Sequence, residues 1–207
     1  MTNASVFLEE VADFLFVRLT GRTADDIMPD ISNGTREGNP MGVEIRKLSV
    51  DDGQDIYEML QELPADENGF VNSVNGKTYS EYQAWLQGAA GSAEQTGLID
   101  GWKVPQTTFW LFENGRPVGI GKVRHLLTDA LREHGGNVGY AIRPSARNRG
   151  LGKEFLALLA DECKRMGVPQ MLLTIQNHNL PSIRVALANG GRTEKVTEER
   201  HYIRIDL

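Results

Sequence analysis

The hydrophobic residues of this chain recur with two different periods that take turns along the sequence. Alternation of apolar and polar residues predicts a strand, and apolar residues every three or four positions predict a helix. The order of these patterns, β-α-α-β-β-β-α-β-α-β-β, indicates a domain of the α/β (α+β) class. Strands are expected at residues 43–48, 107–112, 117–123, 138–142 and 171–175, and two more within 192–207 around a turn near 197–199. Helices are expected at residues 49–63, 80–86, 151–166 and 183–188.

The connections between these elements are polar and carry turn residues. Asn114-Gly115 joins two predicted strands and is the strongest hairpin signal in the chain. Ser49 is the predicted N-cap of the first helix. Polar connections are expected at residues 64–70, which is acidic, at 87–99, read as a loop or frayed helix end, and at 124–136.

The N-terminal region differs from the rest of the chain. Residues 1–20 have the pattern of an amphipathic helix, and residues 21–40 are polar with glycine and proline. The chain is therefore divided into an N-terminal extension, 1–40, and a domain, 41–207. A docking or dimerisation helix, which would make a homodimer, a lid, and a leader segment are the alternatives for the extension.

One stretch combines several independent signals. The predicted strand at 138–142 stops at Pro144, and a helix with a long apolar face begins at Leu151. Between them lies a turn with glycines and arginines. The first N–H groups of a helix lack partners within the helix, and the helix dipole favours negative charge there. The turn is therefore predicted to bind a phosphate or pyrophosphate.

Two common nucleotide motifs do not fit this turn. A Walker A loop needs Ser or Thr after its Gly-Lys pair, but Glu154 follows Lys153, and Arg147 stands where the first glycine belongs. A dinucleotide fingerprint needs a third glycine where this chain has Phe155. Both nucleotide interpretations are excluded.

The charge of the chain limits the kinds of ligand that the turn is expected to bind. The formal net charge is −6 and the pI is about 5.3, so nonspecific binding to nucleic acid or to an anionic membrane is not expected. Against this acidic background the basic residues of the turn form a local cluster, which suggests a discrete anionic ligand. The cluster consists of Arg143, Arg147, Arg149 and Lys153.

The remaining composition points to a reducing compartment and gives no metal signal. The single cysteine, Cys163, lies on a helical apolar face and is interpreted as a small buried hydrophobe. The four histidines have no ligand spacing, so no metal is expected. No signal peptide or apolar run of membrane-spanning length is recognised, and a cytoplasmic location is predicted.

The turn Arg147-Asn-Arg-Gly-Leu-Gly152, between a strand and a helix, resembles the Arg/Gln-x-x-Gly-x-Gly/Ala signature of the GNAT superfamily of N-acetyltransferases. The element order resembles the GNAT fold as well, over about residues 43–207. Segments 43–48, 62–70, 179–182 and 189–191 are similar to a bacterial group of predicted acetyltransferases. The resemblance implies a mixed, mostly antiparallel sheet that splays open between its fourth and fifth strands, with acetyl-CoA as co-substrate.

The resemblance also implies roles for individual residues. The backbone of the turn would hold the pyrophosphate, with two arginines adding charge, and the backbone N–H of Ile142 would bind the thioester carbonyl as the oxyanion donor. Asn179 and Ser182 would flank the cofactor arm; capping of a helix is a compatible role for them. The expected cofactor-binding residues are Ile142, Arg147, Asn148, Arg149, Gly150, Leu151, Gly152, Lys153, Asn179 and Ser182.

The acid and base are less directly indicated. Many relatives carry a tyrosine acid in the helix after the fifth strand, whereas this chain has Asn189 near that place and no tyrosine. Tyr140 and Tyr202 are the candidate replacements, and His125 is a candidate base. A packed aromatic ring and an ordinary histidine are the alternatives.

The acidic loop is the candidate acceptor site, where Asp66 and Glu67 would attract a cationic amine and Phe70 would pack on it. A solvated acidic turn is the alternative. The function indicated is acetyl transfer from acetyl-CoA to a primary amine of a small molecule or peptide, by direct attack in a ternary complex. An acyl-CoA-sensing module without catalysis is the alternative, and a general binder of phosphate ligands is a third.

Overall fold

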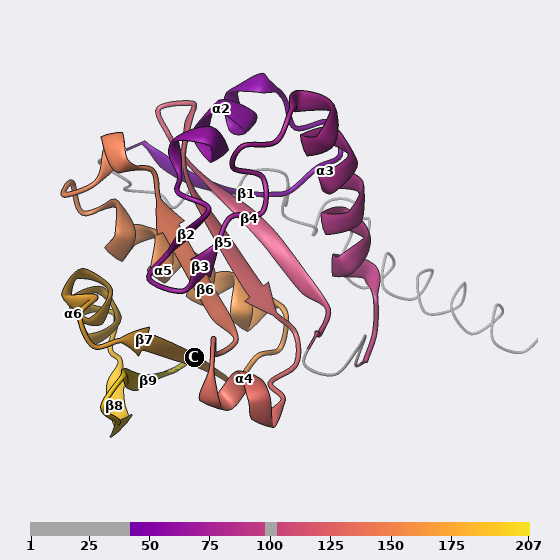
Figure 1. The fold of residues 1–207 in the computed structure, drawn as a ribbon. Helices are drawn as coiled ribbons and strands as arrows, with labels where there is room; N and C mark the ends of the chain where they lie inside the picture. Colours follow the sequence, from indigo (N-terminus) through magenta and orange to yellow (C-terminus); the bar gives the residue numbers. More distant parts are fainter. Residues whose placement is uncertain (1–41, 98–102) are drawn as a thin grey trace, which may run out of the picture. The chain divides into compact units, whose positions relative to one another are not determined.

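The computed structural model describes residues 42–97 and 103–207 (Figure 1). The N-terminal helix predicted for residues 1–20 lies outside these ranges. The strands are β1 Val43–Lys47, β2 Asp66–Glu67, β3 Phe70–Val71, β4 Gln106–Glu113, β5 Arg116–Arg124, β6 Val138–Ile142, β7 Gln170–Gln176, β8 Arg192–Val196 and β9 Arg200–Asp206. The helices are α2 Gln54–Glu62, α3 Tyr79–Glu94, α4 Asp129–Glu133, the 3₁₀ turn η2 Pro144–Ala146, α5 Leu151–Arg165 and α6 Leu180–Ala188.

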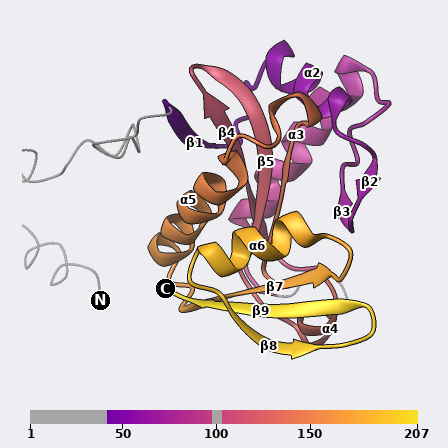
Figure 2. The same cartoon turned by 90° about the vertical axis from the view of Figure 1, so that its left-hand side faces the viewer.

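Four antiparallel strands, in the order β1-β4-β5-β6, form a sheet with helices on both faces (Figure 2). Alternating residues of its strands supply two separate cores. Trp110 and Ile120 pack in a cluster with α2 and α3, whereas Phe109 and Leu111 pack in a cluster with Phe155 of α5. A bulge interrupts the β4-β5 ladder between Leu111 and Phe112, and beyond it the alternation decides which side chains of β5 and β6 can reach each face.

The remaining strands form a second antiparallel sheet, in the order β7-β9-β8. Asn137, just before β6, joins the two sheets: its N–H donates to the Leu172 carbonyl at 3.0 Å, and its side-chain oxygen accepts from the Leu172 N–H at 2.7 Å. Gly136 allows this close approach, because a Cβ there would lie 2.0 Å from the Leu172 carbonyl oxygen. Beyond this junction β6 and β7 have no ladder pairing, so the predicted splay between the fourth and fifth core strands is confirmed.

Most predicted elements are confirmed, including the hairpin at Asn114-Gly115, where both residues have positive φ. The predicted start of the first helix was wrong. The helix begins at Gln54 with Gly53 as N-cap, because the Ser49 N–H donates to the Asp52 carboxylate at 2.8 Å in a preceding turn.

Three connections are more ordered than their composition suggested. Residues 64–70, expected to be a loop, contain most of the small hairpin β2-β3, which turns at Asn68 and Gly69. Helix α3 continues through the expected loop to Glu94, beginning at a capping box between Thr78 and Glu81. The polar connection before β6 contains α4, which is capped by Thr128.

Candidate functional site

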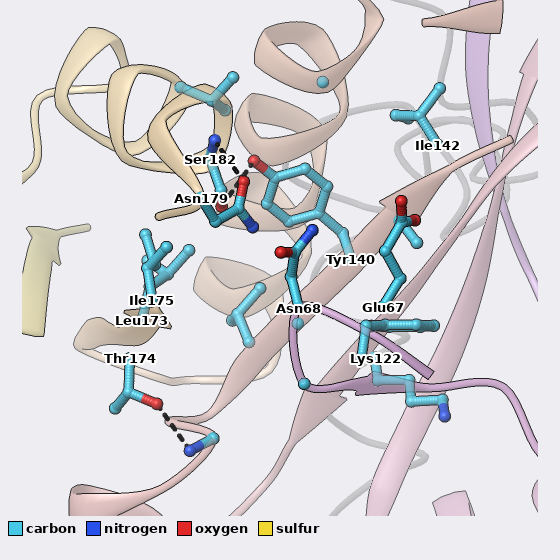
Figure 3. A pocket seen from close by; sticks show the side chains of 18 of the residues that line it. Glu67, Asn68, Lys122, Tyr140, Ile142, Leu173, Thr174, Ile175, Asn179 and Ser182 are labelled. Atoms are coloured by element: carbon cyan, nitrogen blue, oxygen red, sulfur yellow. Dashed lines mark hydrogen bonds between the residues drawn. The ribbon is translucent and has the colours of Figure 1, made fainter. Parts of the chain in front are cut away.

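A cavity of about 830 Å³ opens where β6 and β7 diverge (Figure 3). Its lining comes from β5, β6 and β7, the β2-β3 hairpin, the N-terminal end of α5, and α6. Because these segments are distant in sequence, only the fold brings them together. The volume lies within the range of ordinary small-molecule sites.

One end of the cavity is the turn that leads into α5. Asn148 and Gly150 have left-handed backbones, with φ of 61° and 81°, and Gly150 is the N-cap without any side-chain cap. In the part of the chain that the structure describes, no backbone acceptor is bound by the N–H groups of Leu151 and Gly152. These N–H groups at a helix N-terminus are donors suited to an anion.

The arginines of this turn are arranged differently from expectation. Arg147 forms a bidentate pair with Glu67 at 2.9 and 2.5 Å, and Arg149 pairs with Glu113 at 2.7 Å. Arg149 does not line the cavity. Their charges are thus balanced by carboxylates, and Lys153 is the lining cation of the turn without a carboxylate within 4 Å among the described residues.

The end of β6 presents a backbone N–H to the splay. The N–H of Arg143 donates to the Val118 carbonyl on β5 at 2.9 Å. Successive peptide groups of a strand point to opposite edges, so the N–H of Ile142 is directed away from β5, toward β7. Arg147 holds this strand end, because its Nε donates to the Ile142 carbonyl at 2.9 Å.

Tyr140 lies on the same strand and faces α6. Its hydroxyl is 3.4 Å from the Ser182 hydroxyl, and both residues line the cavity (Figure 3). Burial raises the pKa of Tyr140, so its phenol stays protonated at neutral pH. Asn179 caps α6 by accepting from the Ser182 N–H at 3.2 Å, and it lines the cavity too, so its two predicted roles are compatible.

Two other candidates and the cysteine lie elsewhere. The Tyr202 hydroxyl donates to the Glu133 carbonyl at 3.1 Å, and His125 shares a 2.8 Å hydrogen bond with Thr107; neither residue lines the cavity. Burial raises the pKa of Cys163 to about 12, and this residue sits in the α5 core. The structure therefore places none of the three beside Tyr140.

The β2-β3 hairpin covers the cavity but does not offer a free acidic patch. Asp66 is exposed and does not line the cavity. Glu67 lines it, yet its carboxylate is engaged by Arg147. Phe70 lines the cavity and packs against Gly139, whose added Cβ would lie 3.7 Å from the ring.

Sequence reasoning missed several cationic residues of the cavity, among them Lys122 and Arg124. Both lie on β5 and line the cavity on the side of the hairpin. Lys122 donates to the Val71 carbonyl at 2.9 Å, and its ammonium lies 4.9 Å from the centre of the Phe70 ring. Two cations two positions apart, at the end of a strand whose residues 117–121 are apolar or glycine, were the signal that could have revealed them.

The described residues contain no group of three or more His, Cys, Asp or Glu that could hold a metal ion. Among the helices in those same ranges, none combines the length and apolar character needed to cross a membrane.

Comparison with solved structures identifies the same fold in several bacterial enzymes. A GNAT-family acetyltransferase from Streptococcus pneumoniae has a TM-score of 0.54 at 18% identity, covering 80% of this chain and 99% of that one. yncA from Salmonella typhimurium, solved with its cofactor acetyl-CoA, has a TM-score of 0.54 at 18% identity, covering 80% and 94%. An acetyltransferase from Salmonella typhimurium that modifies the N-terminal serine of ribosomal protein L7/L12 has a TM-score of 0.56 at 14% identity, covering 80% and 95%.

A search of curated proteins found no match to the sequence. The family model described as the acetyltransferase (GNAT) domain matches residues 43–192, which is most of the chain. Together with the splayed sheet and the uncapped turn before α5, this match shows that the chain belongs to the GNAT acetyltransferase family.

Proposed function

We propose that this protein transfers an acetyl group from acetyl-CoA to a primary amine of a small molecule or peptide. The observation that carries the proposal is the position of the uncapped α5 N-terminus at one end of a cavity that continues between β6 and β7. A pyrophosphate at the turn would leave the adjoining splay for the acyl-bearing arm.

The turn fits the diphosphate of the co-substrate. The N–H groups of Leu151 and Gly152, with Lys153 beside them, would hold it, and Asn179 and Ser182 would flank the arm. Arg147 and Arg149 are assigned a different role, because Glu67 and Glu113 already engage them. They position the turn rather than neutralise the ligand.

The chemistry needs a carbonyl donor and a proton for the departing sulfur. The amine nitrogen bonds to the carbonyl carbon, the carbon–sulfur bond breaks, the sulfur gains a proton, and the amine loses one. We assign the Ile142 N–H as the donor to the carbonyl oxygen; removing such a donor typically costs about a hundredfold or more in rate. We assign Tyr140 as the proton donor, since it lines the cavity and its burial keeps it protonated.

The proposal is tested by thiol release from acetyl-CoA across a panel of amines, beside direct titration of CoA. Binding of CoA together with amine-dependent release supports the transferase. Binding without release for every amine would contradict it and favour an acyl-CoA-sensing module. Failure to bind CoA would overturn both assignments.

A further inference from the structure

The half of the cavity away from the α5 turn is lined by cations on one face of β5. A Cβ at Gly121 would lie 2.8 Å from Phe155 and 2.9 Å from Leu159, so that position faces α5. Lys122 and Arg124 therefore face the opposite side, toward the hairpin and α3. Both contribute to the lining of the cavity there.

Neither cation has a carboxylate partner within 4 Å among the described residues. Lys122 donates to the Val71 carbonyl, and Arg124 donates to the carbonyls of Gly135 and Gly136 at 3.2 and 3.1 Å. These neutral acceptors orient the two side chains without balancing their charges. Glu67, the one carboxylate among the described residues of the lining, is already paired with Arg147.

Two further donors belong to residues that line the cavity. The Thr174 hydroxyl accepts from the Gly135 N–H at 2.7 Å, which leaves its own O–H to donate (Figure 3). Arg200 also lines the cavity, and its Nε is a buried donor without a hydrogen-bond partner in the described chain.

The neighbouring positive charges of Lys122 and Arg124 raise the free energy of the folded state. Burial, together with the neighbouring positive charge of Arg124, lowers the pKa of Lys122 to about 8. Burial lowers the pKa of Arg124 as well. A bound anion would reduce this cost, whereas a cationic ligand would increase it.

We propose that the acetyl acceptor is a small amine that also carries a carboxylate or a phosphate, and that Lys122 and Arg124 bind this anion. The proposal rests on the transferase function above and names its substrate class. It replaces the expectation of a cationic acceptor drawn to Asp66 and Glu67. A small molecule is favoured because the hairpin covers Lys122 through Val71 and Phe70, and the 830 Å³ must also admit the end of the co-substrate.

The test compares amines that share one aminoethyl unit and differ only in the attached group. β-Alanine and 2-aminoethyl phosphate carry the two anions, ethanolamine and β-alaninamide are neutral, and 1,2-diaminoethane is cationic. Glycine, 4-aminobutyrate and 6-aminohexanoate vary the distance between amine and carboxylate. Each is titrated calorimetrically into the protein saturated with CoA, and separately assayed for thiol release from acetyl-CoA.

Three variants accompany the series. Lys122→Met removes the charge, Lys122→Arg retains it, and Lys164→Met is a charge-matched control on the exposed face of α5. We expect at least one anionic amine to bind the CoA complex at least tenfold more tightly than its neutral and cationic counterparts. Lys122→Met should lose this preference, and the other two variants should keep it.

The outcomes separate the two proposals. Equal binding of all amines, or a preference for 1,2-diaminoethane, would overturn the anion site even if acetyl transfer occurs. A preference for anionic amines that survives Lys122→Met would overturn the assignment of Lys122. Tight binding of anionic amines without thiol release would support the anion site while contradicting the transferase function.

Discussion

The two halves of the cavity differ in whether their arginine side chains are paired with carboxylates. At the α5 turn, Arg147 and Arg149 are paired with Glu67 and Glu113, and the donors left over are mainly backbone N–H groups. At the β5 end, Lys122 and Arg124 hydrogen-bond to backbone carbonyls, and neither has a carboxylate partner in the described ranges. In the functions proposed above, the first half would therefore bind its ligand mainly through backbone N–H groups, and the second mainly through side-chain charge.

On the proposals above, the two halves would respond differently to mutation. Backbone donors fixed by a helix start tolerate many side-chain changes, provided that the turn keeps its conformation. Side-chain cations on a strand can change one at a time. The following predictions, from the largest effect to the smallest, test this division.

Gly150→Trp should reduce CoA affinity by at least about a hundredfold, because the ring would fill the turn where donors converge. Gly167→Trp is the matched control at the other end of α5: both glycines have positive φ, and an added Cβ meets no atom within 4 Å at either. Both variants should lose about 1 kcal/mol of stability. Equal CoA affinity in the two variants, measured by calorimetry, would refute the backbone clamp.

Tyr140→Phe should lower kcat on the order of a hundredfold with little change in the KM for acetyl-CoA, because the proton donor is lost. Since the pKa of Tyr140 lies above its usual value of 10.0, no loss of wild-type rate from this group is expected up to about that pH. Tyr202→Phe, whose hydroxyl donates to Glu133, should cost about 1 kcal/mol of stability and leave kcat unchanged. Steady-state kinetics in which both variants keep wild-type kcat would remove Tyr140 from the mechanism.

Lys122→Met should raise the free energy of unfolding at pH 7 by about 1–3 kcal/mol, because it removes a poorly solvated charge. The pKa of Lys122 is about 8 in the folded chain, against 10.5 as its ordinary value. The charged Lys122 therefore destabilises the wild-type fold fully below pH 8. This destabilisation declines as pH rises and vanishes above about 10.5. Urea titrations at several pH values measure this destabilisation. If the Lys122→Met protein is less stable than the wild type at pH 7, Lys122 instead stabilises the fold through its contacts with the hairpin.

Glu67 and Arg147 should show a coupling of less than about 1 kcal/mol, since both side chains are about one-third exposed. A double-mutant cycle with Glu67→Gln and Arg147→Gln measures this in urea. Glu67→Gln should raise the acceptor KM a few-fold by loosening the hairpin over the cavity. If its effect is confined to CoA binding, Glu67 belongs to the first half of the cavity alone.

The α5 turn could be predicted from sequence because its donors are contiguous: strand, turn and helix start occupy residues 138–151. The β5 end could not, because Lys122, Thr174 and Arg200 line one cavity only after the two sheets are joined through Asn137. The pairing of Glu67 with Arg147 could not be predicted from the sequence for the same reason. Long-range ion pairs depend on tertiary contacts, whereas helix-start signals are local.

The most direct test of the account is the initial rate of thiol release while acetyl-CoA and an active amine are both varied. Two halves of one cavity should hold both substrates together, so double-reciprocal plots should intersect. Parallel lines would indicate an acetyl group held covalently by the protein between two separate steps, and would contradict direct transfer in this cavity.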